Sequence, residues 1–384
     1  MADELTTILT SFGIPNEAFL AIIVVVLLVI GAVVVIIVSR PVLDIYPYLL
    51  PNAKVRARKG RLFNEKQFSE ILEADDYKEI TNYLRGFPDY AKHLDDHSIE
   101  KSLDIQLGET YHLLSKIAPI DVKKVFVVLS KKSDISNIKS LIASKEAKLT
   151  KDEAENLLIP VGSLYLACEQ LIEANTIEDI VAGLDGTEYA PVLEDALSEY
   201  KENNMILPLE SALDKYFLEN LLSASSVPSD DNTRILHSYI GSQVDVANLK
   251  TIIRSKADGL KYDDISAHVI SNGYQVKEWK LKDLMESESI TSIVNGLEGT
   301  DYSPILSEAL GAYNNTESVS VFEKALDEYI VNYANSLSLK NPLGIGSIIG
   351  YISKKEKEIK NLKIIIRAKR ENNLEMSDIQ EMLV

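Results

Sequence analysis

The stretch Asp134-Ile-Ser-Asn137-Ile-Lys139-Ser-Leu-Ile-Ala-Ser-Lys145 occurs three times in the chain, with substitutions. The second copy is Asp245-Val-Ala-Asn248-Leu-Lys250-Thr-Ile-Ile-Arg254-Ser-Lys256, and the third is Glu358-Ile-Lys-Asn361-Leu-Lys363-Ile-Ile-Ile-Arg367-Ala-Lys369. The spacings between the three asparagines are 248 − 137 = 111 and 361 − 248 = 113. Copies at nearly constant spacing indicate one structural unit used three times.

Other segments repeat with the same period. Thr187-Glu-Tyr189-Ala-Pro191 returns as Thr300-Asp-Tyr302-Ser-Pro304, at an offset of 300 − 187 = 113. Leu84-x-Gly86-x-x-x-Tyr90 is a weaker counterpart in the first unit. Each segment is followed by a run with helical spacing, and long helices are predicted over 99–114, 209–223 and 321–337. A capping box is expected at Thr176 and Asp179, and a left-handed helix end at Gly186.

No run shows sustained alternation of apolar and polar residues, and aromatic residues make up only 7% of the chain, so little or no sheet is expected. The fold class predicted is all-α. The predicted body comprises three helical bundles over residues 62–160, 161–273 and 274–384. A repeat of about 110 residues is too long for an ordinary helical solenoid, whose repeats are about 20 to 50 residues.

The apolar run over 18–38 contains no charge and is long enough to cross a bilayer as a helix. A cleaved signal peptide is disfavoured, because acidic Asp3, Glu4 and Glu17 precede the run and it is too long. The basic residues that follow predict an outside amino terminus and a cytoplasmic body at the cell membrane. They are Arg40, Lys54, Arg56, Arg58, Lys59 and Arg61.

Residues 39–61 are expected to form a juxtamembrane linker, with Pro47 and Pro51 ending the membrane helix. The basic residues between Lys54 and Arg61 could contact anionic lipid heads or an acidic partner. They could equally be a solvated helix start, and the sequence leaves these alternatives open.

Several chemistries are disfavoured. A net charge of −18 argues against nucleic acid as a partner, and Cys168, the single cysteine, is expected in the core. A phosphate-loop motif is absent, and the glycines between Gly344 and Gly350 have the wrong spacing for a dinucleotide loop, so a flexible approach to the last long helix is expected. His93 and His97 have no third metal ligand nearby. We assign no catalytic, cofactor or metal residue and no small-molecule substrate.

The repeated helix has the strongest pattern for a specific role. Asparagine is unfavourable inside a helix, so its recurrence at one register suggests a specific hydrogen bond. The pattern favours a structural role within each bundle, with a partner-facing ring as the alternative. Ala143 occupies the register of the two arginines, so a charge ring there is incomplete. The residues concerned are Asn137, Lys139, Asn248, Lys250, Arg254, Asn361, Lys363 and Arg367.

Two terminal motifs resemble a known family. Pro51-Asn-Ala-Lys54-Val-Arg56-Ala-Arg58-Lys-Gly60 is similar to the opening motif of the C subunits of archaeal A-type ATP synthases, which are related to the d subunits of vacuolar ATPases. The segment from Pro342 to Lys369 resembles the closing signature of that family. The resemblance covers the chain from about Pro51 to its end.

The resemblance implies a funnel of three pseudo-threefold helical bundles that is part of a rotor. Such a subunit would join the central stalk to the membrane ring of proteolipid subunits without catalysing a reaction, so that ion-driven rotation produces ATP. The apolar helix at 18–38 departs from the soluble family pattern, and it could lie inside the ring or face lipid. The acidic balance suggests a negative bore for a basic stalk foot. The alternative function is a membrane-tethered helical scaffold for other cytoplasmic partners.

Overall fold

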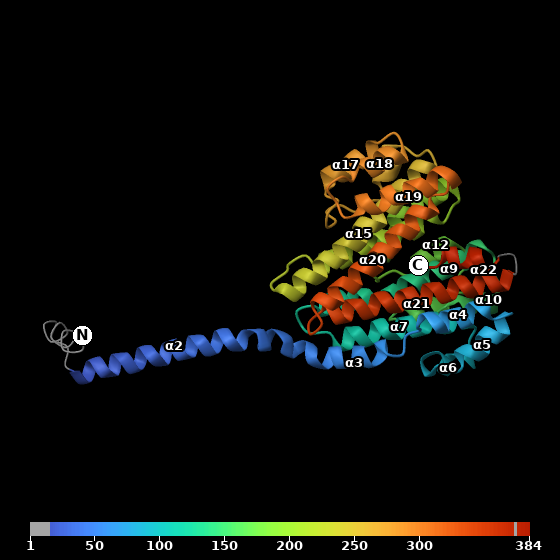
Figure 1. Cartoon of the computed structure of the whole chain (residues 1–384). Helices are drawn as coiled ribbons and strands as arrows, with labels where there is room; N and C mark the ends of the chain where they lie inside the picture. Colours follow the sequence, from blue (N-terminus) through green and yellow to red (C-terminus); the bar gives the residue numbers. More distant parts are fainter. Residues whose placement is uncertain (1–15, 372–374) are drawn as a thin grey trace. The chain divides into compact units, whose positions relative to one another are not determined.

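The computed structural model describes residues 16–371 and 375–384, and these residues form helices joined by turns, without a strand among them. Asp3 and Glu4 lie outside the described residues. The chain divides into two compact units, one up to Leu49 and one from Leu50 to Val384. The all-helical prediction is confirmed (Figure 1).

The first unit contains α2 (Asn16–Ile45) and the short 3-10 helix η1 (Tyr46–Tyr48). The large apolar side chains of α2 between Ile22 and Val38 are exposed. By length and composition, this is the one helix in the described chain that could cross a membrane. The change from α-helix to 3-10 helix occurs at Tyr46, one residue before Pro47, as expected beside a residue that lacks a backbone N–H.

The helix break that we expected at Pro51 does not occur. Helix α3 (Leu49–Lys59) runs through this proline. Pro51 is the third residue of α3, where backbone N–H groups have no partner within the helix, so the missing donor costs little.

The second unit contains three apolar cores. The first core joins the two ends of this unit, since Leu103 of α7 and Ile365 of α21 belong to the same cluster of buried side chains. Its helices are α4 (Glu65–Glu73), α5 (Tyr77–Leu84), α6 (Pro88–Leu94), α7 (Ile99–Ile117), α21 (Gly346–Glu371) and α22 (Met376–Met382). The break between α4 and α5 falls at Asp75 and Asp76, whose exposed carboxylates suit a turn.

The second and third cores each use a continuous stretch of chain. The second contains α9 (Lys132–Glu146), α10 (Lys151–Leu157), α11 (Tyr165–Leu171), α12 (Ile177–Gly183), α13 (Ala190–Asn203) and α14 (Leu207–Ala224), with α8 (Lys123–Ser130) leading into it. The third contains α15 (Asp231–Ala257), α16 (Tyr262–Ser266), α17 (Glu278–Glu286), α18 (Ile290–Gly296), α19 (Tyr302–Thr316) and α20 (Ser320–Lys340). Each core therefore starts with a copy of the repeated helix and continues into the next repeat of the sequence.

Local helix signals are found where the sequence predicts them. Thr176 and Asp179 form a capping box at the start of α12. Gly186 has a φ of +78°, a left-handed conformation that glycine adopts without a Cβ penalty. Cys168 is fully buried in the second core, and burial raises the pKa of its thiol to about 12.

The approach to α21 is tightly held, contrary to the flexible segment that we expected. The backbone N–H of Ile345 donates to Asn232 Oδ1 over 3.0 Å. A Cβ on Gly346 would lie 2.3 Å from the carbonyl oxygen of Leu337. The glycines here allow α20 and α21 to approach closely, so this stretch is a packing feature.

Candidate interaction surface

The three asparagines of the repeated helix are buried and make equivalent hydrogen bonds. Asn248 accepts from Ile270 N over 2.8 Å and donates to Ile270 O over 2.7 Å. Asn137 makes the same pair with Ile159, at 2.7 and 2.9 Å. Asn361 pairs in this way with Val384, at 3.1 Å in each direction. Each amide therefore holds a chain segment 22 or 23 residues further on, through backbone groups that would otherwise be unpaired.

The lysines two residues later bind aspartates on another helix. Lys139 lies 2.6 Å from Asp214 on α14, and Lys250 lies 2.5 Å from Asp327 on α20. Lys363 forms the third pair, with Asp104 on α7. Burial raises the pKa of the Asp104 carboxyl, against the opposing effect of Lys363. In each pair the lysine belongs to one copy of the repeated helix and the aspartate to the long helix that completes the same core.

The arginines of the motif extend two of these contacts. Arg254 pairs with Glu323 of α20, and Arg367 pairs with Glu100 of α7 over 3.3 Å. Both arginines are more than half exposed, so these pairs add little stability. Ala143 stands at this register in the first copy and provides no equivalent charge.

The acidic residue that opens each copy is also buried, a feature that our sequence analysis did not single out. Asp245 accepts from Gln275 N over 2.7 Å and from the Tyr302 hydroxyl over 2.9 Å. Glu358 accepts from Phe63 N over 2.6 Å and pairs with the buried Lys355 over 2.8 Å. The signal was present in the sequence, because an acidic residue precedes each asparagine by three positions.

The predicted basic residues from Lys54 to Arg61 lie on or just after α3, and they do not act as one group. Arg40 belongs to α2 instead. Arg56 donates to Pro342 O over 2.6 Å, and Lys59 approaches the Ser338 hydroxyl at 3.5 Å. Burial lowers the pKa of Lys59, and the nearby charges of Lys354 and Arg56 act in the same direction. Arg61 forms an ion pair with Asp89 over 3.3 Å. Lys54 is exposed and Arg58 is half-buried.

Three turns gather at the end of the second unit where α3 begins. The first turn of α15, directly after the α14–α15 turn, touches the turn before α21 through the hydrogen bond from Ile345 N to Asn232. Asn52 of α3 donates to Leu343 O over 2.8 Å in the same α20–α21 turn. Figure 1 shows α15 and α21 beginning on the side of the body where α3 starts.

The third turn follows α7. Helices α7 and α21 are antiparallel, since Asp104 pairs with Lys363 while Tyr111 donates to Glu356. The end of α7, at Ile117, therefore lies beside the beginning of α21. The α7–α8 turn thus belongs to the same end of the body.

Each turn presents exposed apolar side chains. Ile120 is 79% exposed, Val227 87% and Leu339 82%. We call these residues and their exposed apolar neighbours the tip surface, which comprises Ile120, Val227, Pro228, Leu339, Pro342 and Leu343. Sequence reasoning missed it, although a proline occurs in each of the three turns (Pro119, Pro228 and Pro342).

Charges around the tip surface are uneven. Exposed basic side chains flank the first and third turns, namely Lys116, Lys123, Lys124, Lys340 and Arg56. The first turn also contains the exposed Asp121, and the second turn is followed by Asp230 and Asp231. A chain of net charge −18 thus concentrates part of its positive charge beside two exposed apolar turns. Apolar groups surrounded by charged groups are typical of a surface that binds a partner.

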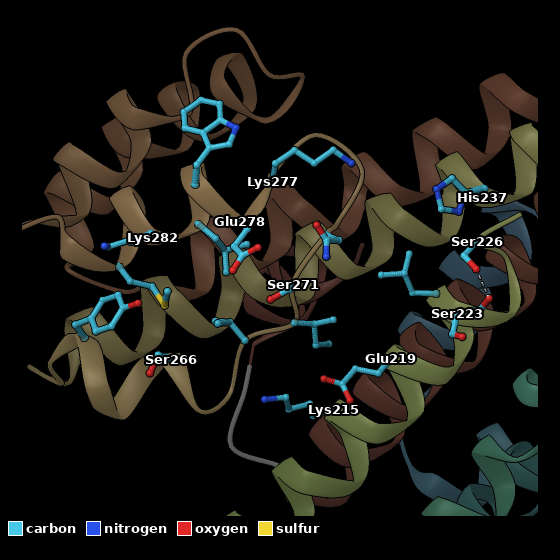
Figure 2. Close-up of a pocket in the computed structure, with 18 residues that line it drawn as sticks. Lys215, Glu219, Ser223, Ser226, His237, Ser266, Ser271, Lys277, Glu278 and Lys282 are labelled. Carbon is cyan, nitrogen blue, oxygen red and sulfur yellow. Dashed lines mark hydrogen bonds between the residues drawn. The ribbon is translucent and has the colours of Figure 1, made fainter.

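A cavity of about 1050 Å³ lies between α14 and the segment from α15 to α17. Figure 2 shows Lys215 and Glu219 on one wall and Glu278 and Lys282 on the other. Two of its lysines are engaged by backbone carbonyls, Lys215 by Ala267 O over 2.7 Å and Lys277 by Gly273 O over 2.6 Å. The walls carry mixed charges, and no three metal-ligating side chains converge anywhere in the described ranges. We therefore place the candidate site at the tip surface.

Comparisons with known proteins point to one family. The family model described as ATP synthase (C/AC39) subunit matches residues 51–382. A protein of Methanobrevibacter smithii, named as the C subunit of an A-type ATP synthase, is 58% identical over 384 residues, which is the whole of both chains. One of Methanothermobacter thermautotrophicus with the same name is 53% identical over the same length. One of Pyrococcus horikoshii, also so named, is 29% identical over 84% of this chain and 86% of its own.

Proposed function

The chain belongs to the ATP synthase (C/AC39) subunit family, and from that premise we propose that it is a non-catalytic rotor subunit. Its role is to couple the central stalk to the membrane proteolipid ring, so that rotation driven by an ion gradient produces ATP. The proposed body is a funnel built from three sequence repeats with boundaries near 62–160, 161–273 and 274–384, and each of its cores combines helices of two repeats.

One observation carries this proposal beyond the family assignment. The tip surface lies at the end of the body where α3 begins. Helix α2, which precedes α3 in the chain, is the only described helix that could cross a membrane. The chain thus leads from its membrane segment into the end of the body that carries exposed apolar residues. Such a body is suited to sit on a membrane assembly. We propose that the tip surface contacts the proteolipid ring, with the lysines beside it aligning the two partners.

The repeated helices support a role in load transfer. We propose that the asparagine and lysine of each copy join consecutive sequence repeats into one rigid body. The supporting contacts are the Lys139–Asp214, Lys250–Asp327 and Lys363–Asp104 pairs, each of which links a repeat to the next or the last to the first.

The charge distribution supports one membrane orientation. We propose that residues 18–38 cross the cell membrane with the amino terminus outside and the body in the cytoplasm. The supporting feature is the set of basic residues from Arg40 to Arg61, since positive residues remain on the cytoplasmic side. The net charge of −18 supports binding of a basic stalk foot, and we expect that binding to weaken as ionic strength rises.

The first experiment is purification of the full chain from native membranes in mild detergent. A tag is best inserted after Glu317, in the turn between α19 and α20, because Asn361 binds the backbone of the carboxy-terminal Val384. We expect stalk and proteolipid subunits to co-purify with ATP hydrolysis activity. Recovery of unrelated cytoplasmic partners without the ATPase would favour the scaffold function instead.

Substitutions at the tip surface test the contact itself. We expect Val227→Asp combined with Leu339→Asp to reduce the recovered proteolipid several-fold, because each buries a charge at the proposed interface. The matched control is Leu207→Asp, a 60% exposed leucine at the start of α14, away from the α14–α15 turn. Unchanged proteolipid recovery in a folded double variant would overturn the proposed contact.

A further inference from the structure

We propose that α2 lies inside the proteolipid ring, in contact with the apolar inner wall formed by the ring helices. This inference rests on the proposed rotor function and adds the location and partner of one segment. Three independent features of the chain lead to it: the surface of the helix, its position outside the family body, and the length of its connection.

Between Ala18 and Val38 the surface of α2 is apolar on every side. No charged residue occurs between Ala18 and Val38, and the large apolar side chains from Ile22 to Val38 are all exposed. A helix without a polar stripe needs apolar surroundings around its whole circumference. It is therefore unsuited to line an aqueous path for the transported ion.

Helix α2 lies before the part of the chain that the family model matches. The family model begins at residue 51, after α2 and η1. The Methanobrevibacter smithii relative aligns with all of this chain, whereas the Pyrococcus horikoshii relative aligns with 84% of it. The match to the family model therefore gives no location for α2, and this location must be inferred from the features of the helix itself.

The connection between helix and body is short. Helix α2 ends at Ile45, and the compact body begins at Leu50. Five residues span at most about 18 Å even when fully extended. An end of α2 that lies further than this from the rotation axis must therefore travel with the body as the body turns.

Rotation then leaves one location for the helix. A ring that rotates in the membrane must turn against a stationary membrane subunit. Outside the ring, α2 would have to travel around the circumference and pass that stationary subunit in every turn. Inside the ring, it turns about an axis close to its own and meets no stationary part. The lumen also provides apolar contacts in all directions, which is what the uniform surface of α2 requires.

The test is site-specific photo-crosslinking within the assembled complex. A photoreactive amino acid is introduced singly in place of Val26, Leu27, Leu28 or Val29, which point in four directions because successive helix residues are about 100° apart. We expect all four positions to crosslink to the proteolipid and none to the stationary membrane subunit. Lys148, beyond the end of α9 that lies away from the tip surface, is the control position and should give no proteolipid crosslink.

Crosslinks to the stationary subunit, or crosslinks to lipid alone from all four positions, would overturn the lumen location. The rotor function and the location of α2 are tested separately in this experiment. If stalk and ring subunits do not co-purify with the chain, the rotor function itself is wrong. If they co-purify and the four positions give no proteolipid crosslink, only the location of α2 is wrong.

Discussion

Asn248 illustrates how a single buried amide holds the turn that follows its helix. We expect Asn248→Ala to lower the free energy of unfolding by about 1–3 kcal/mol, because it leaves the N–H and C=O of Ile270 buried without partners. Urea denaturation of the detergent-solubilised chain, followed by far-ultraviolet circular dichroism, measures the change. Asn315→Ala, at an exposed position of α19, is the control and should have little effect. Equal effects of the two substitutions would show that Asn248 has no special role.

Asp245 should make the stability of the third core depend on pH. Burial raises the pKa of its carboxyl, although hydrogen bonds from Gln275 and Tyr302 act in the opposite direction. The folded state therefore binds the proton more tightly than the unfolded state. The contribution of this group to stability is greatest below about pH 4 and falls as the pH rises through the raised pKa.

We expect Asp245→Asn to remove this pH-dependent contribution. The loss of stability caused by the substitution should be larger near pH 4 than near pH 7, because only the native carboxyl gains from protonation. Urea midpoints of both proteins across this range measure the difference. Asp263→Asn, at an exposed position, is the control. A loss that grows with pH would mean that the folded pKa of Asp245 is lowered instead of raised.

The position of each asparagine could be predicted from the sequence, but its partner could not. Periodicity identified Asn137, Asn248 and Asn361 as equivalent, and their burial and bonding are equivalent in the structure. The partner groups are backbone atoms 22 or 23 residues away, and their approach depends on how the intervening turn folds. Tertiary geometry of this kind leaves no residue-type signal in a single sequence.

At the scale of elements, the closest helix contact is between α20 and α21. We expect Gly346→Ala to cost about 1–3 kcal/mol of stability, since its Cβ would lie 2.3 Å from the carbonyl oxygen of Leu337, which belongs to the backbone. Gly311→Ala is a matched control in α19, where an added Cβ meets nothing within 4 Å. That control should stabilise the protein by about 0.5–1 kcal/mol, because alanine is the better helix former. Thermal unfolding of the two variants distinguishes a packing constraint from a general effect of glycine.

Long helices were predictable because their apolar spacing is sustained over several turns. The runs predicted over 209–223 and 321–337 correspond to α14 (Leu207–Ala224) and α20 (Ser320–Lys340). The continuation of α3 through Pro51 was not predicted, because the effect of a proline depends on whether it falls in the first turn of a helix. The exposed side chains of Ile120, Val227 and Leu339 were also not predicted. Whether an apolar residue is exposed depends on how the ends of neighbouring helices pack in three dimensions.

At the scale of the whole molecule, the first core depends on both ends of the second unit. Ile379 of α22 is 1% exposed within the core that also contains Leu103 of α7. We expect truncation after Glu371, which removes α22, to speed amide exchange in α4–α7 by about tenfold or more, since burial of one isoleucine alone is worth about 1.5–3 kcal/mol. Hydrogen exchange read by mass spectrometry measures this effect. The second core, from α9 to α14, should keep its protection.

A point substitution separates loss of core contacts from a general effect of truncation. Ile379→Ala should reproduce part of the faster exchange in α4–α7, while Gln380→Ala, at an exposed position of α22, should not. Equal acceleration in all three cores would contradict the assignment of α22 to the first core alone. The sequence indicated three repeats, but it did not show that each core takes helices from two of them.

The shared core also constrains how the protein is made. The interval between synthesis of Leu103 and of Ile379 (379 − 103 = 276 positions) corresponds to roughly 14–55 s at ordinary rates of translation. Helices α4–α7 must wait through this interval with their apolar faces uncovered, while α9–α14 and then α15–α20 complete their own cores. The earliest part of the body to be synthesised is thus the last to be finished, and newly made chains depend on protection of that segment until synthesis ends.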